Sequence, residues 1–473
     1  MNIAMILEMA ASAGDRPAVT AGGRTLTTTE LLRRAHAAAR RFADRPAVVY
    51  LGANHLTYPV ALFGAALAGV PFVPMNYRLG PEQLATLRAR HPGALVLNPG
   101  ALDDIEGTDE QVTAPYDADA IAVLLYTSGT TAEPKAAVLR HRHLLAYILN
   151  TLEFGSAGAD DAALVAVPPY HIAGLANLLT NIYTGRRVVY MPSFDPNEWL
   201  ETVRRERITH SLVVPTMLAR IVQAVGGDDA RTPTLRSLAY GGARTPRPVL
   251  ERALQVFRGT GFVNAYGLTE TASSIAVLGP NDHRKALAAT DPAVRDRLTS
   301  VGRALPGIEF QIRTVDGDVA PVGEIGLVFA RGDQISGEYR GQEGASPDGW
   351  FATRDRGRMD ADGYLWIEGR DDDTIIRGGE NIAPAEIEDV LLTHPDVVEA
   401  AVVGVPDPEW GQRLVAVLVG TGDPAEIRRW AKDRLRTSKT PDTIVFRPEL
   451  PKTASGKLIR RALLADLEET SHA

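Results

Sequence analysis

Short apolar runs alternate with helix-like stretches from the N-terminus to about residue 270. The runs are bounded like buried strands, and they lie at 47–51, 121–126, 164–167 and 188–190. Stretches with helical patterning lie between them and include 29–42, 144–149 and 197–205. Such alternation predicts an α/β architecture built on layered, mainly parallel sheets.

The pattern changes between residues 300 and 370. Glycine and aspartate separate short apolar runs at 310–312 and 326–329, which predicts a small antiparallel or barrel-like section. The polar and charged segment 279–300 is predicted to be a surface excursion. A smaller α+β pattern follows residue 373, with helices expected at 387–392 and 425–435 and strands at 400–405 and 414–419.

A dense acidic turn at 370–373 marks the predicted domain boundary. A chain of 473 residues exceeds the size at which one core usually divides, so at least two units are expected. We predict a large N-terminal domain over 1–371 and a smaller α+β C-terminal domain over 372–473.

The stretch from Tyr58 to Tyr77 contains no charged residue, but prolines and glycines interrupt it. A buried helix near 60–68 and a short strand at 72–73 explain it better than a membrane span. The first residues lack a basic segment and include Glu8, so they do not resemble a signal peptide. We therefore expect no membrane insertion and a cytoplasmic location.

Composition removes several classes of function. The chain has no cysteine, which excludes disulfides, thiolate nucleophiles and sulfur-ligated zinc. Its net charge of -8 gives no electrostatic reason to expect a nucleic-acid partner. No pattern in the sequence indicates an oligomeric state.

A loop rich in hydroxyl groups follows the strand expected at 121–126. Its sequence is Thr127-Ser128-Gly129-Thr130-Thr131-Ala132-Glu133-Pro134-Lys135. Hydroxyls and backbone N–H groups at a strand exit suit anionic oxygens, and a lysine adds a positive charge. The loop is not a Walker A motif, because no glycine precedes Lys135 and Ala136 follows it. Taken alone, the loop could equally be a polar surface turn.

Further motifs follow this loop in a fixed order. They are Tyr266-Gly267-Leu268-Thr269-Glu270, Thr353-Arg354-Asp355, Glu368-Gly369-Arg370-Asp371-Asp372, Gly378-Gly379-Glu380-Asn381-Ile382-Ala383-Pro384 and Pro451-Lys452-Thr453-Ala454-Ser455-Gly456-Lys457. Together with the loop, this series resembles the adenylate-forming superfamily of acyl-CoA synthetases, peptide-synthetase adenylation domains and luciferases. Weaker similarity to that superfamily extends over nearly the whole chain.

The resemblance implies that a carboxylic acid is activated by ATP and Mg²⁺ as an acyl-AMP, with release of pyrophosphate. Positioned cations and amide donors carry most of such catalysis, because charge builds on the phosphoryl oxygens. The resemblance assigns catalysis to Lys457, Glu270, Thr130 and His171. Lys457 would bridge the carboxylate and the α-phosphate, Glu270 would hold Mg²⁺, and His171 would gate the acyl site.

The remaining site assignments also follow from the resemblance. The residues expected to bind the nucleotide or the acceptor are Thr127, Ser128, Gly129, Thr131, Lys135, Gly241, Gly242, Ala243, Tyr266, Gly267, Thr269, Asp355, Arg370 and Gly379. Among these, Tyr266 would stack on adenine, and Asp355 with Arg370 would hold the ribose. Each residue type also has an ordinary structural role, such as a core tyrosine, a structural Asp–Arg pair or a satisfied core histidine.

The acceptor is expected to be a pantetheine thiol, on coenzyme A or on the phosphopantetheine arm of a carrier protein. Asp372 occupies the position of the family's hinge, which makes the C-terminal domain a mobile lid that carries Lys457. Amino-acid-activating relatives have an aspartate in the region that here reads Tyr170-His171-Ile172-Ala173-Gly174. Without that aspartate, a free α-amino acid is disfavoured as substrate. The pocket is expected near Asn177, Asn264, Ser273 and Ser274, and these partly polar residues suit a small aryl or short functionalised acid.

Several positions depart from the family pattern. Ala132 and Ala136 stand where the loop usually has glycine, Glu133 adds a negative charge, and Arg354 replaces the usual glycine before the ribose acid. Because of these changes, two alternatives to acid–thiol ligation stay open. One is adenylation with a non-thiol acceptor or of an unusual anion such as nitrite. The other is a degenerate, non-catalytic nucleotide-binding module.

Overall fold

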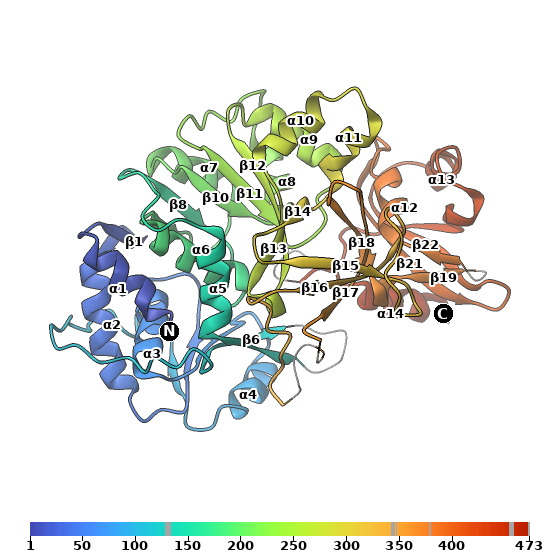
Figure 1. Ribbon diagram of the computed structural model, residues 1–473. Coiled ribbons are helices and arrows are strands. Elements are labelled where there is room, and N and C mark those ends of the chain that lie inside the picture. Colours follow the sequence, from blue (N-terminus) through green and yellow to red (C-terminus); the bar gives the residue numbers. More distant parts are fainter. Residues whose placement is uncertain (128–133, 342–345, 347, 378–379, 454–457, 472–473) are drawn as a thin grey trace.

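The computed structural model describes residues 1–127, 134–341, 346, 348–377, 380–453 and 458–471. It consists of a large α/β part and, after residue 370, a smaller α+β part (Figure 1). The predicted fold class is confirmed. No helix among the described residues has the length and apolar character needed to cross a membrane.

The largest sheet has nine strands. Its strands are β1 (Pro17–Ala21), β2 (Arg24–Thr27), β8 (Ala162–Val165), β9 (Arg187–Tyr190), β10 (His210–Val213), β11 (Ser237–Gly241), β12 (Gly261–Leu268), β13 (Ser273–Leu278) and β14 (Arg303–Ala304). They lie in the order β14-β13-β12-β11-β10-β8-β9-β1-β2, and the pairings from β12 through β10 and β8 to β1 are parallel. The carboxyl ends of β11 and β12 therefore meet at one edge, where α/β sheets bind ligands.

A second sheet has five strands in the order β5-β3-β4-β6-β7. These are β3 (Val48–Leu51), β4 (Phe72–Met75), β5 (Leu95–Leu97), β6 (Ile121–Thr127) and β7 (Lys135–Arg140). Only β6 and β7 pair antiparallel, and their pairing places Thr127 opposite Lys135. The uncharged stretch forms the buried helix α3 (Thr57–Ala68) followed by β4, as predicted.

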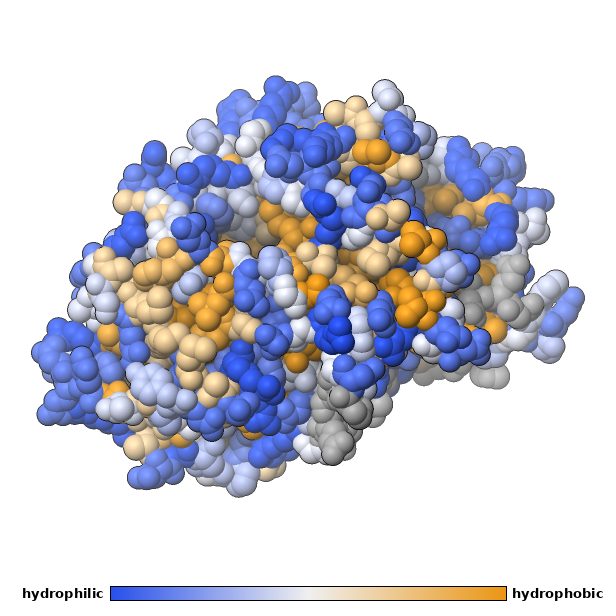
Figure 2. Space-filling view, in the orientation of Figure 1, coloured by the Kyte–Doolittle hydropathy of each residue, from blue (hydrophilic) through white to orange (hydrophobic). Residues whose placement is uncertain are grey.

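Helices cover both sheets. Besides α3, the helices of the large part before residue 260 are α1 (Ala4–Ser12), α2 (Thr28–Phe42), α4 (Pro81–Ala89), α5 (His141–Thr151), α6 (Ile172–Thr184), α7 (Pro196–Arg205), α8 (Pro215–Ala224) and α9 (Arg247–Val256). Side-chain caps define where two of these helices begin. Thr27 and Glu30 form a capping box at the N-terminus of α2, and Asp195 caps the N-terminus of α7. On the face in Figure 2, apolar residues gather across the middle of the view and hydrophilic residues cover most of the rim.

The strand expected at 164–167 begins and ends two residues earlier, as β8 (Ala162–Val165). Pro168 and Pro169 follow, and proline has no N–H to donate to a neighbouring strand. The carbonyl of Val167 instead accepts a hydrogen bond from the Asn54 amide at 3.0 Å. The chain therefore leaves the sheet early and leads into the start of α6.

The antiparallel section between residues 300 and 370 is confirmed as a four-stranded sheet. Its strands are β15 (Glu309–Arg313), β16 (Gly326–Arg331), β17 (Phe351–Met359) and β18 (Leu365–Arg370), paired in that order. The segment 279–300 contains the helices α10 (Pro280–Ala288) and α11 (Pro292–Asp296) and the 3-10 turn Arg297–Thr299.

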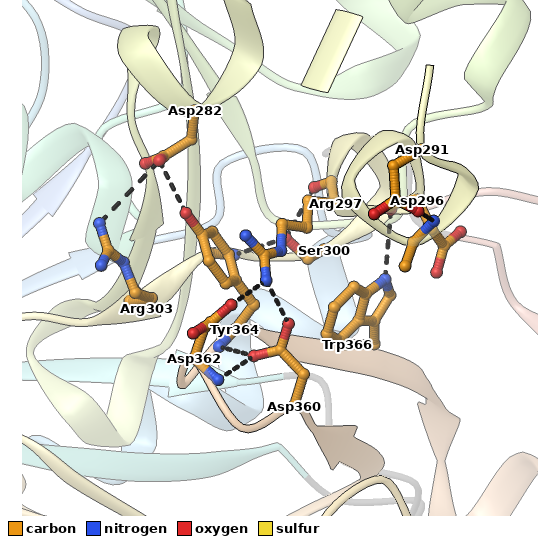
Figure 3. Close-up of polar contacts among 12 residues, drawn as sticks. Asp282, Asp291, Asp296, Arg297, Ser300, Arg303, Asp360, Asp362, Tyr364 and Trp366 are labelled. Atoms are coloured by element: carbon orange, nitrogen blue, oxygen red, sulfur yellow. Dashed lines mark hydrogen bonds and ion pairs between the residues drawn. The ribbon is translucent and has the colours of Figure 1, made fainter. Parts of the chain in front are cut away.

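A polar cluster ties this excursion to the turn between β17 and β18 (Figure 3). The Arg297 guanidinium binds Asp360 at 3.1 Å and lies 4.2 Å from the centre of the Tyr364 ring. The Tyr364 hydroxyl donates to Asp282 at 2.8 Å, and the Trp366 indole N–H donates to the Asp296 carbonyl at 3.3 Å. The excursion is therefore fastened to the β17–β18 hairpin.

The C-terminal part starts with the 3-10 turn Asp371–Asp373. It contains β19 (Ile375–Arg377), β20 (Glu380–Ile382), α12 (Pro384–Leu391), β21 (Val397–Asp407), β22 (Gly411–Gly420), α13 (Pro424–Lys432), the 3-10 turn Thr437–Lys439, β23 (Thr443–Phe446) and α14 (Arg460–Ser471). Its two hydrophobic clusters draw only on residues from Ile375 onward. The domain boundary at 371/372 stays a prediction, placed within the acidic turn.

Candidate active site

The end of β12 and the middle of β17 bring Tyr266 and Asp355 together. The Tyr266 hydroxyl donates to one carboxylate oxygen of Asp355 at 2.6 Å, and Arg370 donates to the other at 3.1 Å. Burial raises the pKa of Tyr266, and the Asp355 carboxylate raises it further, so the phenol remains a donor. Asp355 is only 3% exposed, and the two donors fix the orientation of its buried carboxylate.

A β-bulge in β17 aims Asp355. Ala352 pairs with Phe329 of β16 and Arg356 pairs with Leu327, so three residues of β17 oppose the single residue Val328. The Thr353 hydroxyl donates to the Val328 carbonyl at 2.8 Å and accepts from the Asp355 amide at 3.1 Å. Bulges next to active sites redirect side chains in this way.

Arg354 lies at the centre of this bulge with φ of +62°. A positive φ is easily adopted by glycine and disfavoured for other L-residues, which explains why relatives of the predicted family usually have glycine here. Arg370, not Arg354, pairs with Asp355. The exposed Arg354 guanidinium forms no hydrogen bond or ion pair with any residue that the structure describes.

Glu270 lies in a tight turn between β12 and β13. The turn comprises a 3-10 segment at Thr269–Thr271, followed by Ala272 with φ of +51° and Ser273 with φ of +115°. A Cβ on Gly267 would lie 2.0 Å from the Ser273 carbonyl oxygen, so only glycine fits there. The turn folds back tightly and presents the Glu270 side chain at the edge of the sheet.

The segment Ser336–Arg340 joins this turn to the strand that begins with Lys135. The amides of Ser336 and Gly337 donate to the Glu270 carbonyl at 2.9 and 3.1 Å. On the other side, the Val138 amide donates to the Glu338 carbonyl, and the Arg340 amide donates to the Ala136 carbonyl, both at 2.9 Å. Arg140 also grips the Glu338 carboxylate with two bonds, at 2.9 and 2.8 Å.

Tyr339, at the centre of that segment, touches both predicted phosphate-binding groups. Its hydroxyl donates to the Glu270 carboxylate, and the Lys135 ammonium lies 5.6 Å from the centre of its ring. The sequence reasoning did not single out Tyr339. No local signal marks it, because its partners are distant in sequence and meet it only through the pairing of this segment with β7.

The glycines at the end of β11 are required by the protein's own backbone. A Cβ on Gly241 would lie 2.1 Å from the Ala265 carbonyl oxygen, so the close approach is to the neighbouring strand β12. Gly242 has φ of +83° and turns the chain away from the sheet, with Ala243 exposed after it. Their contact with adenine and the acyl group stays a prediction.

His171 lies just before α6 with its ring packed against that of Tyr170, 4.5 Å between centres. Burial lowers the pKa of His171 to about 4, so the ring is neutral at neutral pH. The Nε2 atom of His171 and the hydroxyl of Tyr170 are buried and have no hydrogen-bond partner among the described residues. A neutral ring beside a second unsatisfied polar atom suits contact with a bound ligand.

Six of the expected site residues lie outside the described residues, namely Ser128, Gly129, Thr130, Thr131, Gly379 and Lys457. The described ends of the first loop are held together, since the Thr127 hydroxyl donates to the Lys135 carbonyl at 3.5 Å. Thr269 lies in the Glu270 turn. The expected residues that the structure brings to one edge of the sheet are Lys135, Tyr266, Gly267, Thr269, Glu270, Asp355 and Arg370.

Glu270 is the predicted metal ligand, and its carboxylate binds the hydroxyl of Tyr339, whose ring lies near Lys135. The described residues contain no group of three or more histidine, aspartate or glutamate side chains able to hold a metal ion. One carboxylate fits Mg²⁺, because this ion commonly binds one or two protein carboxylates and takes its other ligands from phosphates and water. The donor set does not fit zinc, which needs more protein ligands.

Two protein-family models match most of the chain. The model for the AMP-binding enzyme family matches residues 7–98 and 88–340, and the model for the AMP-binding enzyme C-terminal domain matches residues 386–457. The feruloyl-CoA synthase of an Amycolatopsis species is 36% identical over 94% of each chain. The indoleacetate–CoA ligase of Aromatoleum aromaticum is 33% identical over 88% of this chain and 87% of its own.

Solved structures agree with these relatives. The o-succinylbenzoate CoA synthetase (MenE) of Bacillus subtilis, in complex with its acyl-adenylate intermediate, superposes with a TM-score of 0.85 at 29% identity and covers 97% of both chains. The same enzyme in complex with ATP and a magnesium ion gives a TM-score of 0.84 at 29% identity, over 97% of this chain and 98% of that one.

Proposed function

Because the chain belongs to the AMP-binding enzyme family, we propose that it is an AMP-forming acid–CoA ligase acting on a small aryl acid. A carboxylate oxygen of the acid attacks the α-phosphorus of ATP, and pyrophosphate leaves. The thiol sulfur of coenzyme A then attacks the acyl carbon, and AMP leaves with the electron pair of the broken C–O bond. We expect the reaction in the cytoplasm.

One observation carries this proposal. A nucleoside end, built from Tyr266, Asp355 and Arg370, lies at the same sheet edge as a phosphate end built from Glu270 and Lys135. The first end offers an anchored carboxylate to the two ribose hydroxyls. The second offers a cation and a Mg²⁺ ligand to the phosphates, where catalysis of adenylation must stabilise charge.

Magnesium bound with ATP would neutralise phosphate charge, and Glu270 is the residue that would hold it. Lys135 and the loop from Thr127 to Thr131 would orient the phosphates. Lys457 would lie between the attacking carboxylate and the α-phosphate. Neutral His171, whose Nε2 has no hydrogen-bond partner in the described part of the chain, would form part of the wall around the acyl group, together with Tyr170.

The substrate class follows from the relatives and from this wall. Three relatives are named for feruloyl, indoleacetyl and succinylbenzoyl groups, each of which contains an aromatic ring. Aromatic rings at Tyr77, Tyr170 and His171 pack edge to face or tilted, and an aryl group would extend that stack. Coenzyme A is the proposed acceptor, and the arm of a carrier protein is the alternative.

The two half-reactions would use a rotation at Asp372. The two residues beside it form ion pairs with different parts of the chain. Asp371 pairs with Arg356 of the large part at 3.4 Å, and Asp373 pairs with Arg460 of α14 at 3.5 Å. Torsions at Asp372 can therefore change while both pairs stay intact. Asp372→Pro should keep acyl-AMP formation and lose thioester formation, whereas Asp372→Ala should keep both.

An ATP–pyrophosphate exchange panel over aryl acids, short-chain acids and inorganic anions including nitrite tests the proposed function. We expect exchange with at least one aryl acid, and its loss in Lys457→Ala with ATP binding retained. ATP binding without exchange for any anion would instead support a non-catalytic module. Exchange with nitrite alone would show that the substrate is not an aryl acid. A thioester formed only on a carrier protein would show that coenzyme A is not the acceptor.

A further inference from the structure

Backbone strain is concentrated at the candidate active site. Six described residues other than glycine have positive φ, and three of them, Ala272, Ser273 and Arg354, belong to the Glu270 turn or to the bulge beside Asp355. Residues held in sparsely populated conformations cluster at functional sites, where other interactions compensate their cost. Arg354 is the one of these three with a long charged side chain.

No hydrogen bond or ion pair among the described residues involves the Arg354 side chain. Its guanidinium is exposed, and the acid next to it, Asp355, is bound by Arg370 and Tyr266 instead. Glycine at this position would shape the same bulge without strain. The exposed Arg354 guanidinium is therefore available for contact with a ligand bound beside Asp355.

The position of Arg354 points to the phosphate end of the site. Burial and the Glu270 carboxylate raise the pKa of Tyr339, and the positive charges of Arg354 and Arg370 act against them. The positive charge of Arg354 therefore lowers the pKa of Tyr339. Tyr339 is the residue that contacts both Glu270 and Lys135. The Arg354 backbone adjoins Asp355 in the bulge, and an arginine side chain is long enough to reach from there to the space between the proposed ribose end and the proposed phosphate end.

We propose that Arg354 binds the β- and γ-phosphate oxygens of ATP, as a nucleotide contact that the family's usual glycine cannot make. This inference rests on the proposed function, since it assumes that Asp355 holds the ribose. The planar guanidinium offers paired N–H donors that match phosphate oxygens. The contact also adds a positive charge for the phosphates. It would offset the changes in the phosphate loop, where alanines at 132 and 136 replace glycines and Glu133 adds a negative charge.

Calorimetric titration of Arg354→Gly with ATP and, separately, with AMP tests this contact. Loss of a charged hydrogen bond should raise the Kd for MgATP about tenfold or more. The Kd for AMP should stay within about twofold, because AMP has no β- or γ-phosphate, and the midpoint of thermal unfolding should not fall. Arg354→Lys should recover part of the ATP affinity.

Arg207→Gly is the matched control, because Arg207 is an exposed arginine with φ of +53° far from the site in sequence and fold. It should change neither affinity. Arg354→Asn provides a second variant that tolerates a left-handed backbone and removes the charge. It should match Arg354→Gly in ATP affinity.

Three results would overturn the inference. Unchanged ATP affinity in both uncharged variants would remove the contact. Equal weakening of ATP and AMP would assign Arg354 to the ribose end instead. An effect confined to the KM for coenzyme A would assign it to the phosphates of that acceptor. Failure of the unmodified protein to bind ATP at all would contradict the proposed function rather than this role of Arg354.

Discussion

The Tyr339 hydroxyl donates a hydrogen bond to the carboxylate of Glu270, which lies 69 residues earlier in the chain. The ring of the same tyrosine lies under the Lys135 ammonium, 5.6 Å from its centre. One side chain therefore sets the spacing between the expected Mg²⁺ ligand and the expected phosphate lysine. The backbone of Ser336–Arg340 fixes it by bonds to both neighbouring elements.

Tyr339→Phe removes the hydrogen bond to Glu270 and keeps the ring under Lys135. Glu270 then loses its orienting donor, so we expect the Mg²⁺ concentration for half-maximal pyrophosphate exchange to rise about tenfold. Calorimetric titration with ATP at low and high Mg²⁺ should show the same shift in affinity. Tyr116→Phe, at an exposed tyrosine, is the control. An unchanged Mg²⁺ dependence would show that Tyr339 does not orient the metal ligand.

Glu399→Gln should slow the first half-reaction alone. The Glu399 carboxylate binds Lys452 at 2.5 Å, and the backbone of Lys452 pairs with that of Leu458. These contacts fasten the described flanks of the segment that carries Lys457. We expect exchange with pyrophosphate to fall about tenfold, while a supplied acyl-AMP still reacts with coenzyme A at the normal rate.

The matched control for that variant is Glu386→Gln, which breaks a similar pair with Lys439 on the same part of the chain. It should leave both half-reactions unchanged. An equal loss in both half-reactions for Glu399→Gln would mean that the pair stabilises the fold in general and does not position Lys457.

Stability should fall as pH drops below about 6.5. Burial lowers the pKa of His141 and of His143 to about 4, and the Nδ1 atom of each accepts a backbone N–H, from Ile3 and Arg140. A pKa below the unfolded value of 6.5 gives stability that is present above pH 6.5 and is lost as the pH falls toward 4.

Urea unfolding between pH 7.5 and pH 4 measures this loss. Each histidine contributes a slope of at most about 1.4 kcal/mol per pH unit to the free energy of unfolding. His141→Gln should flatten the dependence. A free energy of unfolding that stays constant between pH 6.5 and pH 4.5 would show that these rings are not held neutral.

Arg297→Met should weaken the fold and spare the site. The Arg297 guanidinium forms an ion pair with Asp360 and a cation–π contact with Tyr364, both at the turn of the β17–β18 hairpin (Figure 3). We expect a loss of about 1–2 kcal/mol in the free energy of unfolding, with normal ATP affinity. The Asp355–Arg370 pair lies at the other end of the hairpin and should be unaffected.

The exposed pair of Arg252 and Asp228 offers the comparison for Arg297. Arg252→Met should cost less than about 0.5 kcal/mol, because exposed ion pairs contribute little. If the two variants were equally stable, the cluster around Tyr364 would not hold the excursion 279–300 in place.

Local pattern in the sequence was enough to predict most elements near the site. The runs at 121–126 and 188–190 became β6 and β9, and the stretch 29–42 became α2, because burial and capping act on neighbouring residues. The ordered motifs also placed Tyr266, Glu270, Asp355 and Arg370 at one site. These residues carry a signal of their own, in type and in spacing.

Contacts between distant segments could not be predicted in this way. Tyr339 has ordinary neighbours in sequence, and its role appears only when Ser336–Arg340 pairs with β7. The positive φ of Arg354 depends on a bulge whose register is set by β16. The helices α10 and α11 were not predicted, because both are short and mostly polar, and α11 has no buried residue to reveal a helical period.

The most direct test of the account is a product analysis with an aryl acid, ATP, Mg²⁺ and coenzyme A. Mass spectrometry and nucleotide chromatography of one reaction should show an aryl thioester of coenzyme A, AMP and pyrophosphate in equal amounts. The account predicts this stoichiometry for the unmodified protein and its loss in Lys457→Ala. Formation of ADP, or of no thioester with any aryl acid that supports pyrophosphate exchange, would contradict it.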